Sequence, residues 1–245
     1  MVDLGVIFFA VFLGAFFATA SGFGYALIAT PILSMIMPVK EAVILILFST
    51  IILRVFTMLR VRGEYDTKTV CTVSLGSIIG SIPGSMVLKF ITANVLEMFL
   101  GATLLVATWL MHREFYFRID NKNVGRLGVG FLSGFFGAAT SVSGPPIVLY
   151  FLNEGTTKEA MRANMIWIFG VTGVTMLLAN YWAGNTLLVE DLSVIFYTIP
   201  AVFAGIFAGE LAFKNISQRI FRNFSLAIVC SGALLLLCNG LRELF

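Results

Sequence analysis

The sequence predicts an all-α polytopic membrane protein of two inverted repeats, each a broken, re-entrant helical hairpin followed by three transmembrane helices. Three observations lead to this prediction: apolar blocks long enough to span a bilayer, helix breakers inside two of those blocks, and a likeness between the two halves. Hydrophobic residues make up 59% of the 245 residues and charged residues 12%, about half the charge of a soluble domain. This composition predicts the lipid bilayer as the surroundings, and the net charge of +3 does not suggest nucleic-acid binding.

Charged residues divide the sequence into eight apolar blocks, and six of them have the length of a single membrane span. The blocks are residues 4–39, 41–59, 70–88, 91–111, 127–153, 163–183, 192–213 and 223–241. The first and fifth are uncharged for 36 and 27 residues. A continuous helix would be about 54 and 40 Å long, against a hydrocarbon core of about 30 Å. Because both blocks contain clustered glycine, serine and proline, we expect two shorter helices joined by an unwound turn in each.

The second half of the chain repeats motifs of the first half in the same order. Three stretches recur: Phe12–Gly24 as Phe131–Gly144 with one gap, Lys40–Ala42 as Lys158–Ala160, and Ile79–Thr92 as Ala204–Ser217. A shared order is stronger than any one match, because apolar sequences align easily by chance. The pattern predicts an internal duplication, with a first repeat over 1–112, a linker over 113–122 and a second repeat over 123–245.

The basic residues favour repeats of opposite orientation. If each breaker-rich block enters and leaves the membrane on one side, 13 of the 16 Lys and Arg residues fall on a single side. Lys40, Lys89 and Arg242 remain on the other side. Since basic loops stay in the cytoplasm, we expect residues 113–126 to be cytoplasmic and both termini to lie outside.

The two breaks predict a substrate site near the middle of the membrane. Unwound backbone is costly in hydrocarbon unless it faces protein or a water-filled cavity, and breaks at matching places in inverted repeats point to one shared site. A helix that starts after a break presents unpaired N–H groups and the positive end of its dipole, which suits a small anion. The predicted lining residues are Ser21, Gly22, Gly24, Tyr25, Thr140, Ser141, Ser143, Gly144 and Pro145. The glycines outside the breaks, Gly14, Gly134 and Gly137, are expected to allow close helix packing instead.

Other polar residues in the apolar blocks admit two interpretations each. Arg54 either binds the anion or extends to the cytoplasmic surface beside Arg60. Asn164 is a candidate for the rim of the same cavity. Glu210 is expected to pair with Lys214 one helical turn later, in preference to a role in proton coupling.

The sequence contains no enzymatic constellation. It has no paired carboxylates, no nucleophile with a base and no nucleotide-binding loop. Cys71, Cys230, Cys238 and the single histidine, His112, have no metal-ligand spacing. We therefore expect neither an enzyme nor a cofactor or metal, while proton or sodium coupling and a homodimer stay open. A non-transporting scaffold that holds partners through glycine-rich packing is an alternative function.

The break of the second half carries a motif with a known counterpart. It runs "GFLSGFFGAATSVSGPPIVLYFL", and it has a weaker echo, "FLGAFFATASGFG", in the first half. A G-x-x-x-G followed by Lys also recurs before the last block of each half. With these features the chain resembles the sulfite exporter TauE/SafE family, also called the TSUP family.

The resemblance implies a secondary transporter of sulfite or small organosulfonates such as sulfoacetate, usually an exporter, in the bacterial cytoplasmic (inner) membrane. It implies alternating access, with a sulfur oxyanion held between the two hairpins. The motif positions that would line the path are Gly22, Gly24, Thr140, Ser143, Gly144 and Pro145. The first break has Tyr25 and Ala26 where the second has Pro145 and Pro146. Because the two walls differ, another small anion such as a carboxylate stays open as the substrate.

Overall fold

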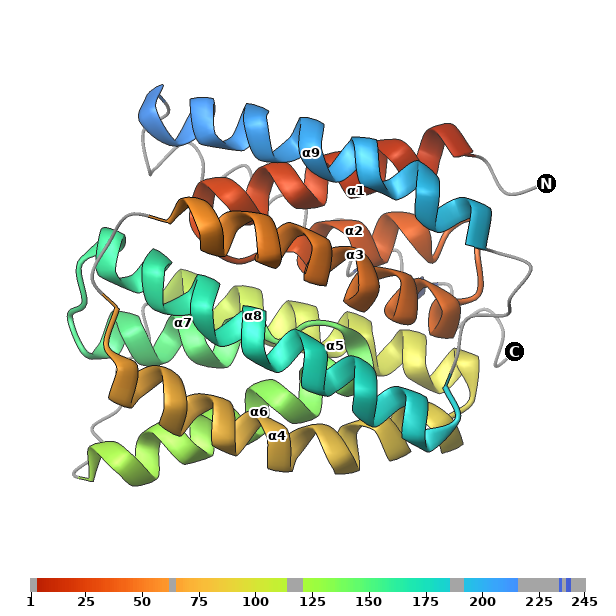
Figure 1. Ribbon diagram of the computed structural model, residues 1–245. Helices are drawn as coiled ribbons and strands as arrows, with labels where there is room; N and C mark the ends of the chain where they lie inside the picture. Colours follow the sequence, from red (N-terminus) through yellow and green to blue (C-terminus); the bar gives the residue numbers. More distant parts are fainter. Residues whose placement is uncertain are drawn as a thin grey trace.

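The computed structural model describes residues 4–61, 65–113, 121–185 and 192–215, together with Leu234, Leu237 and Cys238. These residues form helices and no strand, which confirms the predicted all-α class (Figure 1). In chain order the helices are α1 (Leu4–Ser21), α2 (Tyr25–Leu33), α3 (Val39–Arg60), α4 (Thr67–Phe90), α5 (Ala93–Arg113), α6 (Lys122–Thr140), α7 (Gly144–Asn153), α8 (Lys158–Ala183) and α9 (Leu192–Asn215).

Each of the two long uncharged blocks folds into a long helix, an unwound turn and a short helix, as predicted. Residues 22–24 separate α1 from α2, and residues 141–143 separate α6 from α7. The turns need left-handed backbone, with φ of 86° at Gly22 and 97° at Gly24, which glycine adopts without steric cost. Ser141 takes φ 63° in the second turn, an uncommon value for a residue with a side chain. The short helices have 9 and 10 residues, about half the thickness of a bilayer core.

The two broken hairpins open toward opposite ends of the bundle (Figure 1). The α1–α2 hairpin opens at the end that holds the N-terminus, and the α6–α7 hairpin opens at the other end. In the described part of the chain, three ion pairs lie at this second end: Arg60–Glu210 at 3.0 Å, Lys122–Glu154 at 2.8 Å and Arg126–Asp66 at 3.2 Å. We call it the ion-pair end, and it holds the described basic loops that the sequence places in the cytoplasm.

Glu210 forms an ion pair with a neighbouring helix. Its partner is Arg60 at the end of α3, whereas the predicted partner, Lys214, has a side chain outside the described part. Most of the linker 113–122 and the predicted last span over 223–241 also lie outside the described residues. The boundaries of the two repeats stay a prediction.

Among the described residues, four helices are long and apolar enough to cross a bilayer, judged by length and composition. They are α1, α3, α4 and residues Glu159–Ala183 of α8, and α9 has a shorter apolar part at Phe196–Ala212. Large apolar side chains such as Phe90 and Trp182 are exposed on the outside of the bundle. A surface of this kind is expected in lipid, so the chain is a multi-pass membrane protein.

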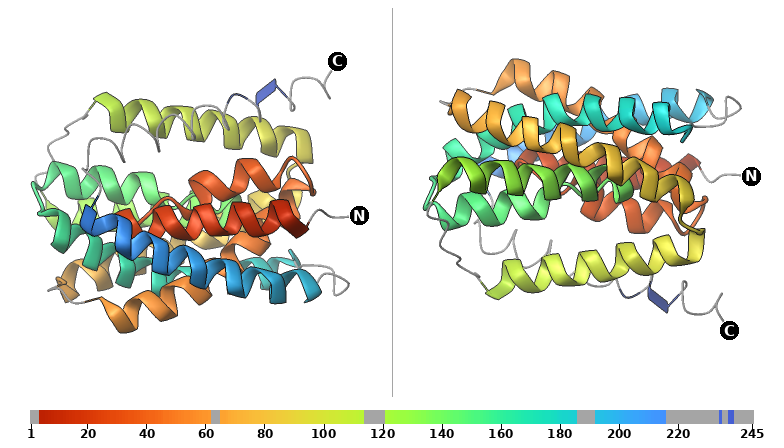
Figure 2. Two further views of the ribbon diagram at one scale, coloured as in Figure 1. Left: turned by 90° about the horizontal axis from the view of Figure 1, so that it is seen from above. Right: turned by 90° about the horizontal axis from the view of Figure 1, so that it is seen from below.

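The most extensive helix contacts join α4 to α6 and α1 to α9, and glycine permits both (Figures 1 and 2). A Cβ atom on Gly80 would overlap the backbone carbonyl of Phe131, and one on Gly134 would overlap that of Ser77. On the other seam, a Cβ on Gly205 would lie 2.6 Å from a backbone oxygen of α1. Small residues let helix backbones approach this closely. The packing role predicted for Gly14, Gly134 and Gly137 is confirmed, because an added Cβ would meet a neighbouring helix or turn at each.

We expect the two ends of the bundle to face opposite sides of the membrane, and this expectation gives a direct test of topology. In a variant without the native cysteines, we expect Asn123→Cys to react with a membrane-impermeant maleimide only from the cytoplasm. Met35→Cys should react only from outside, because Met35 is 60% exposed in the α2–α3 connection at the opposite end. Labelling of intact cells and of inverted vesicles measures both. The reverse pattern would contradict the orientation inferred from the basic residues.

Candidate functional site

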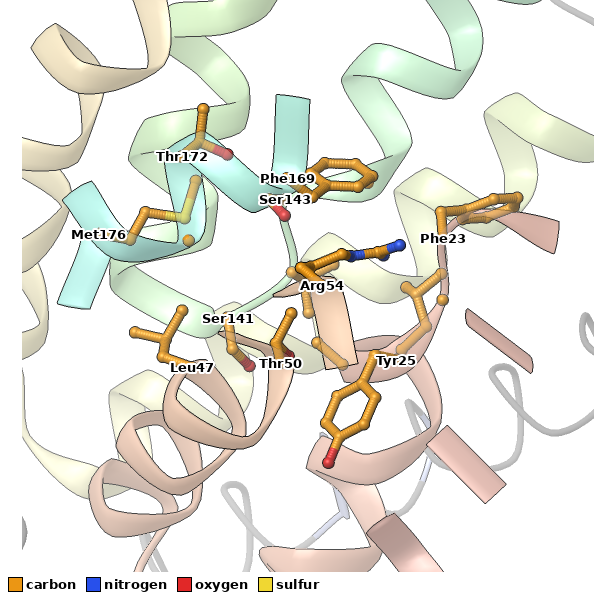
Figure 3. Close-up of a pocket in the computed structure, with 16 residues that line it drawn as sticks. Phe23, Tyr25, Leu47, Thr50, Arg54, Ser141, Ser143, Phe169, Thr172 and Met176 are labelled. Atoms are coloured by element: carbon orange, nitrogen blue, oxygen red, sulfur yellow. The ribbon is translucent and has the colours of Figure 1, made fainter. Parts of the chain in front are cut away.

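A cavity of about 40 Å³ lies between the two unwound turns (Figure 3). It has room for roughly three water molecules, which is the size of a small oxyanion. Its wall consists of Phe23–Leu27 at the start of α2, Ser141–Gly144 before α7, Leu47, Thr50 and Arg54 of α3, and Phe169, Thr172, Gly173 and Met176 of α8. Because the middle parts of two spanning helices line it, the cavity lies near mid-depth in the bundle.

Arg54 places a buried positive charge in this wall. Only 3% of the residue is exposed. Its Nη2 donates to the carbonyl of Gly22 at 3.1 Å, and the guanidinium carbon lies 5.1 Å from the centre of the Phe169 ring. In the described part of the chain, Nε and Nη1 are buried without a hydrogen-bond partner, and no described carboxylate forms an ion pair with Arg54. Such a group is costly unless an opposite charge meets it, so this wall suits an anion. The alternative that Arg54 extends to the membrane surface does not match the structure.

The end of α1 lowers the cost of burying this charge. Arg54 contacts the Gly22 carbonyl, and Nε of Arg162 donates to the carbonyl of Thr19 at 3.1 Å. These oxygens lie at the C-terminal end of α1, where the helix dipole is negative. The two arginines therefore also hold the unwound turn between α1 and α2 in place.

The start of α2 supplies N–H donors to the same cavity. Gly24–Leu27 line it, and the first N–H groups of a helix have no partner within the helix. The start of α7 offers fewer donors than expected from the sequence, because Pro145 and Pro146 lie in its first turn and have no N–H. Proline at a helix start costs no hydrogen bond within the helix, because the N–H there would have no helical partner. It also has no N–H to donate to an anion. The two hairpins thus contribute unequally.

Some of the predicted site residues line the cavity and some do not. Those that line it are Gly24, Tyr25, Arg54, Ser141, Ser143 and Gly144, and those that do not are Ser21, Gly22, Thr140, Pro145 and Asn164. Tyr25 contributes to the wall near its backbone, because its hydroxyl donates to Ser49 at 2.8 Å and points away from the cavity in Figure 3.

The hydroxyls nearest the helix ends form hydrogen bonds with backbone carbonyls. The Ser21 hydroxyl lies 2.8 and 2.7 Å from the carbonyl oxygens of Phe17 and Phe23, and its one hydrogen is shared between these two acceptors. Thr140 donates to the carbonyl of Phe136 at 2.7 Å. Short polar side chains commonly bond to nearby backbone in this way, and it removes both hydroxyls from the donors expected for an anion.

Asn164 lines a second cavity, of about 440 Å³, at the ion-pair end. Its Oδ1 accepts from the backbone N–H of Asp66 at 2.9 Å. The hydrogen bond from the Thr69 hydroxyl, followed by backbone N–H groups and the charge of Arg126, lowers the pKa of Asp66. Asp66 therefore stays ionised at neutral pH and keeps its ion pair with Arg126. The prediction that Asn164 lies at the rim of the central cavity is wrong, because it is too near the N-terminal end of α8.

A cluster of apolar side chains lies between the two cavities. It includes Phe169, which lines the central cavity, and Phe151, which lines the second. Ile147, Met165 and Ile168 fill the space between and are fully buried. This cluster separates the central cavity from the second cavity.

The sequence interpretation missed the contributions of α3 and α8 apart from Arg54. Leu47, Thr50 and Arg54 follow a spacing of three and four residues, as do Phe169, Thr172 or Gly173, and Met176. This is the spacing of one helix face. Extending that face from Arg54 would have found Thr50. Among the described residues there is no group of histidine, cysteine and carboxylate side chains able to hold a metal ion.

Comparison with known proteins places the chain in a family. The family model described as "Sulfite exporter TauE/SafE" matches residues 7–236. A protein of Cupriavidus necator named "Probable sulfite/organosulfonate exporter TauE" is 26% identical over 182 residues, which cover 70% of each chain. No solved structure matches. Because the family model spans nearly the whole sequence, including both broken hairpins, the chain belongs to the sulfite exporter TauE/SafE family.

Proposed function

We propose that this protein is a secondary transporter that exports sulfite, or a small organosulfonate such as sulfoacetate, across a bacterial cytoplasmic membrane. One observation carries the proposal: the buried guanidinium of Arg54 has two nitrogens without a described hydrogen-bond partner. Arg54 lines the cavity that lies between the two unwound turns. Family membership and the name of the Cupriavidus necator relative support the substrate class.

The chemistry of the wall suits a sulfur oxyanion. Sulfite and sulfonate groups present three oxygens and a negative charge. Arg54 supplies the counter-charge, the start of α2 supplies N–H donors, and Thr50 and Ser143 supply hydroxyls. Charge-assisted hydrogen bonds are roughly twice as strong as neutral ones. A cavity of about 40 Å³ suits sulfite as it stands, whereas the tail of a larger sulfonate requires the turns to move apart.

The arrangement of the hairpins supports alternating access. Since they open to opposite ends, tilting one against the other exposes the cavity to one side at a time. Ile147, Met165 and Ile168 belong to the buried apolar cluster between the central cavity and the second cavity. The hydroxyls of Thr30 and Ser141 share a hydrogen bond of 3.0 Å that joins α2 to the second turn. We propose that the apolar cluster and the Thr30–Ser141 hydrogen bond open in turn, so that the cavity is exposed to one side at a time.

Flux through purified protein in proteoliposomes tests the proposal. We expect uptake of labelled sulfite, sulfoacetate or taurine under a pH or sodium gradient, and little uptake of acetate. Uptake of acetate alone would indicate a carboxylate carrier. No flux of any sulfur oxyanion under either gradient would overturn the proposal and favour the scaffold alternative.

A further inference from the structure

Thr172 has a buried hydroxyl that its own helix leaves free. The residue is 0% exposed and lines the central cavity (Figure 3). Its Oγ1 has no hydrogen-bond partner in the part of the chain that the structure describes. Several other buried hydroxyls in the spanning helices bond to the preceding turn, as Ser49 does to Leu45 at 2.8 Å and Thr57 to Leu53 at 2.9 Å.

The position of Thr172 distinguishes it from the other buried hydroxyls without a described partner. Those belong to Thr19, Ser74 and Ser77, and none of them lines the cavity. Thr19 and Ser77 lie at the glycine seams, against Gly209 and Gly134, where helices are pressed together. A buried hydroxyl without a partner is costly, and at Thr172 a molecule in the cavity can supply the partner.

Thr172 also occupies the place in α8 that Arg54 occupies in α3. Each follows the Lys-Glu-Ala sequence of its half, at Lys40 or Lys158, by the same number of residues. The helices α3 and α8 pack against each other, and both residues line the same cavity. The duplicated framework therefore presents a cation from one half and a hydroxyl from the other.

We propose that Thr172 is a second substrate ligand and determines selectivity for oxyanions with three oxygens. This inference rests on the proposed transport of a sulfur oxyanion. The planar guanidinium of Arg54 can pair with two oxygens of one ligand, and the Thr172 hydroxyl donates to the third. A carboxylate has only two oxygens, so when both pair with Arg54 it has no third oxygen to place near Thr172.

Replacing Thr172 with valine removes the hydroxyl at nearly constant volume. In sulfite flux into proteoliposomes we expect the KM to rise about tenfold, with the inhibition constant of competing acetate unchanged. Thr172→Ser should restore the wild-type KM. Thr175→Val is the matched control, because that hydroxyl donates to the carbonyl of Thr172 at 2.9 Å and does not line the cavity.

The outcomes separate this inference from the proposed function. Absence of sulfite flux in the wild type overturns the proposed function itself. Wild-type flux with an unchanged KM in Thr172→Val overturns the role of Thr172, and equal weakening of sulfite and acetate overturns its role in selectivity. If Thr172→Val is not recovered folded, Thr172→Ala and Thr172→Ser provide the comparison. Equal KM values for these two variants also overturn the inference.

Discussion

Replacing Arg54 with glutamine should abolish sulfite transport and leave the protein folded. Glutamine can keep a hydrogen bond to the Gly22 carbonyl, which Arg54 now makes at 3.1 Å, but it has no charge. Loss of one charge-assisted contact in a buried site is expected to weaken binding on the order of a hundredfold. Arg54→Lys should give intermediate activity, since lysine keeps the charge and loses the planar fork that suits an oxyanion.

Flux and ligand-induced thermal stabilisation together measure this effect. Sulfite should raise the melting temperature of the purified wild type and not that of Arg54→Gln. Arg60→Gln is the matched control on the same helix, because Arg60 is 43% exposed and paired with Glu210, and such surface pairs contribute little. Full transport by Arg54→Gln would show that the buried charge serves only to hold the end of α1.

Replacing Gly80 with alanine should prevent correct assembly of the helix bundle. The new Cβ would overlap the carbonyl of Phe131, which is backbone and cannot rotate away as a side chain can. The helices α4 and α6 would have to separate along their whole contact. We expect a loss of stability of about 3 kcal/mol, at the upper end for overpacking. The fraction of monodisperse protein in detergent and its melting temperature measure the loss.

Gly128→Ala is the control for this change. Gly128 lies in α6, and an added Cβ there would meet nothing within 4 Å. Alanine is also the better helix former by about 1 kcal/mol, so this variant should be as stable as the wild type or more so. If Gly80→Ala and Gly128→Ala had the same melting temperature, the glycine seams would not determine the packing.

The breaks were predictable from the sequence because their causes are local. An uncharged block too long for one span must be interrupted, and Gly22 and Gly24 supply the left-handed backbone that the turn needs. The ends of α1 and α6 follow from this. The orientation of Arg54 was not predictable, since α3 is apolar on most sides and the sequence does not fix the face turned toward the cavity.

The hydrogen-bond partner of each hydroxyl could not be predicted from the sequence, for a different reason. Whether a serine in a turn faces a cavity or bonds to backbone depends on one side-chain torsion angle. Ser21 and Thr140 bond to their own helices, whereas Ser143 lines the cavity. The place of Asn164 depends on how far α8 extends beyond the cavity, which only the packed bundle determines.

The depth of the central cavity has an electrical consequence. An ion held there has crossed about half of the voltage between the two sides. One elementary charge moving through 100 mV changes its free energy by about 2.3 kcal/mol, and the cytoplasm of a living cell is the negative side. A monovalent anion leaving the cell would thus move with the field both into the cavity and out of it. Beside Arg54 it would form a pair without net charge, so a movement of the loaded site itself would carry no charge through the field, whereas the return of the empty, positively charged site would.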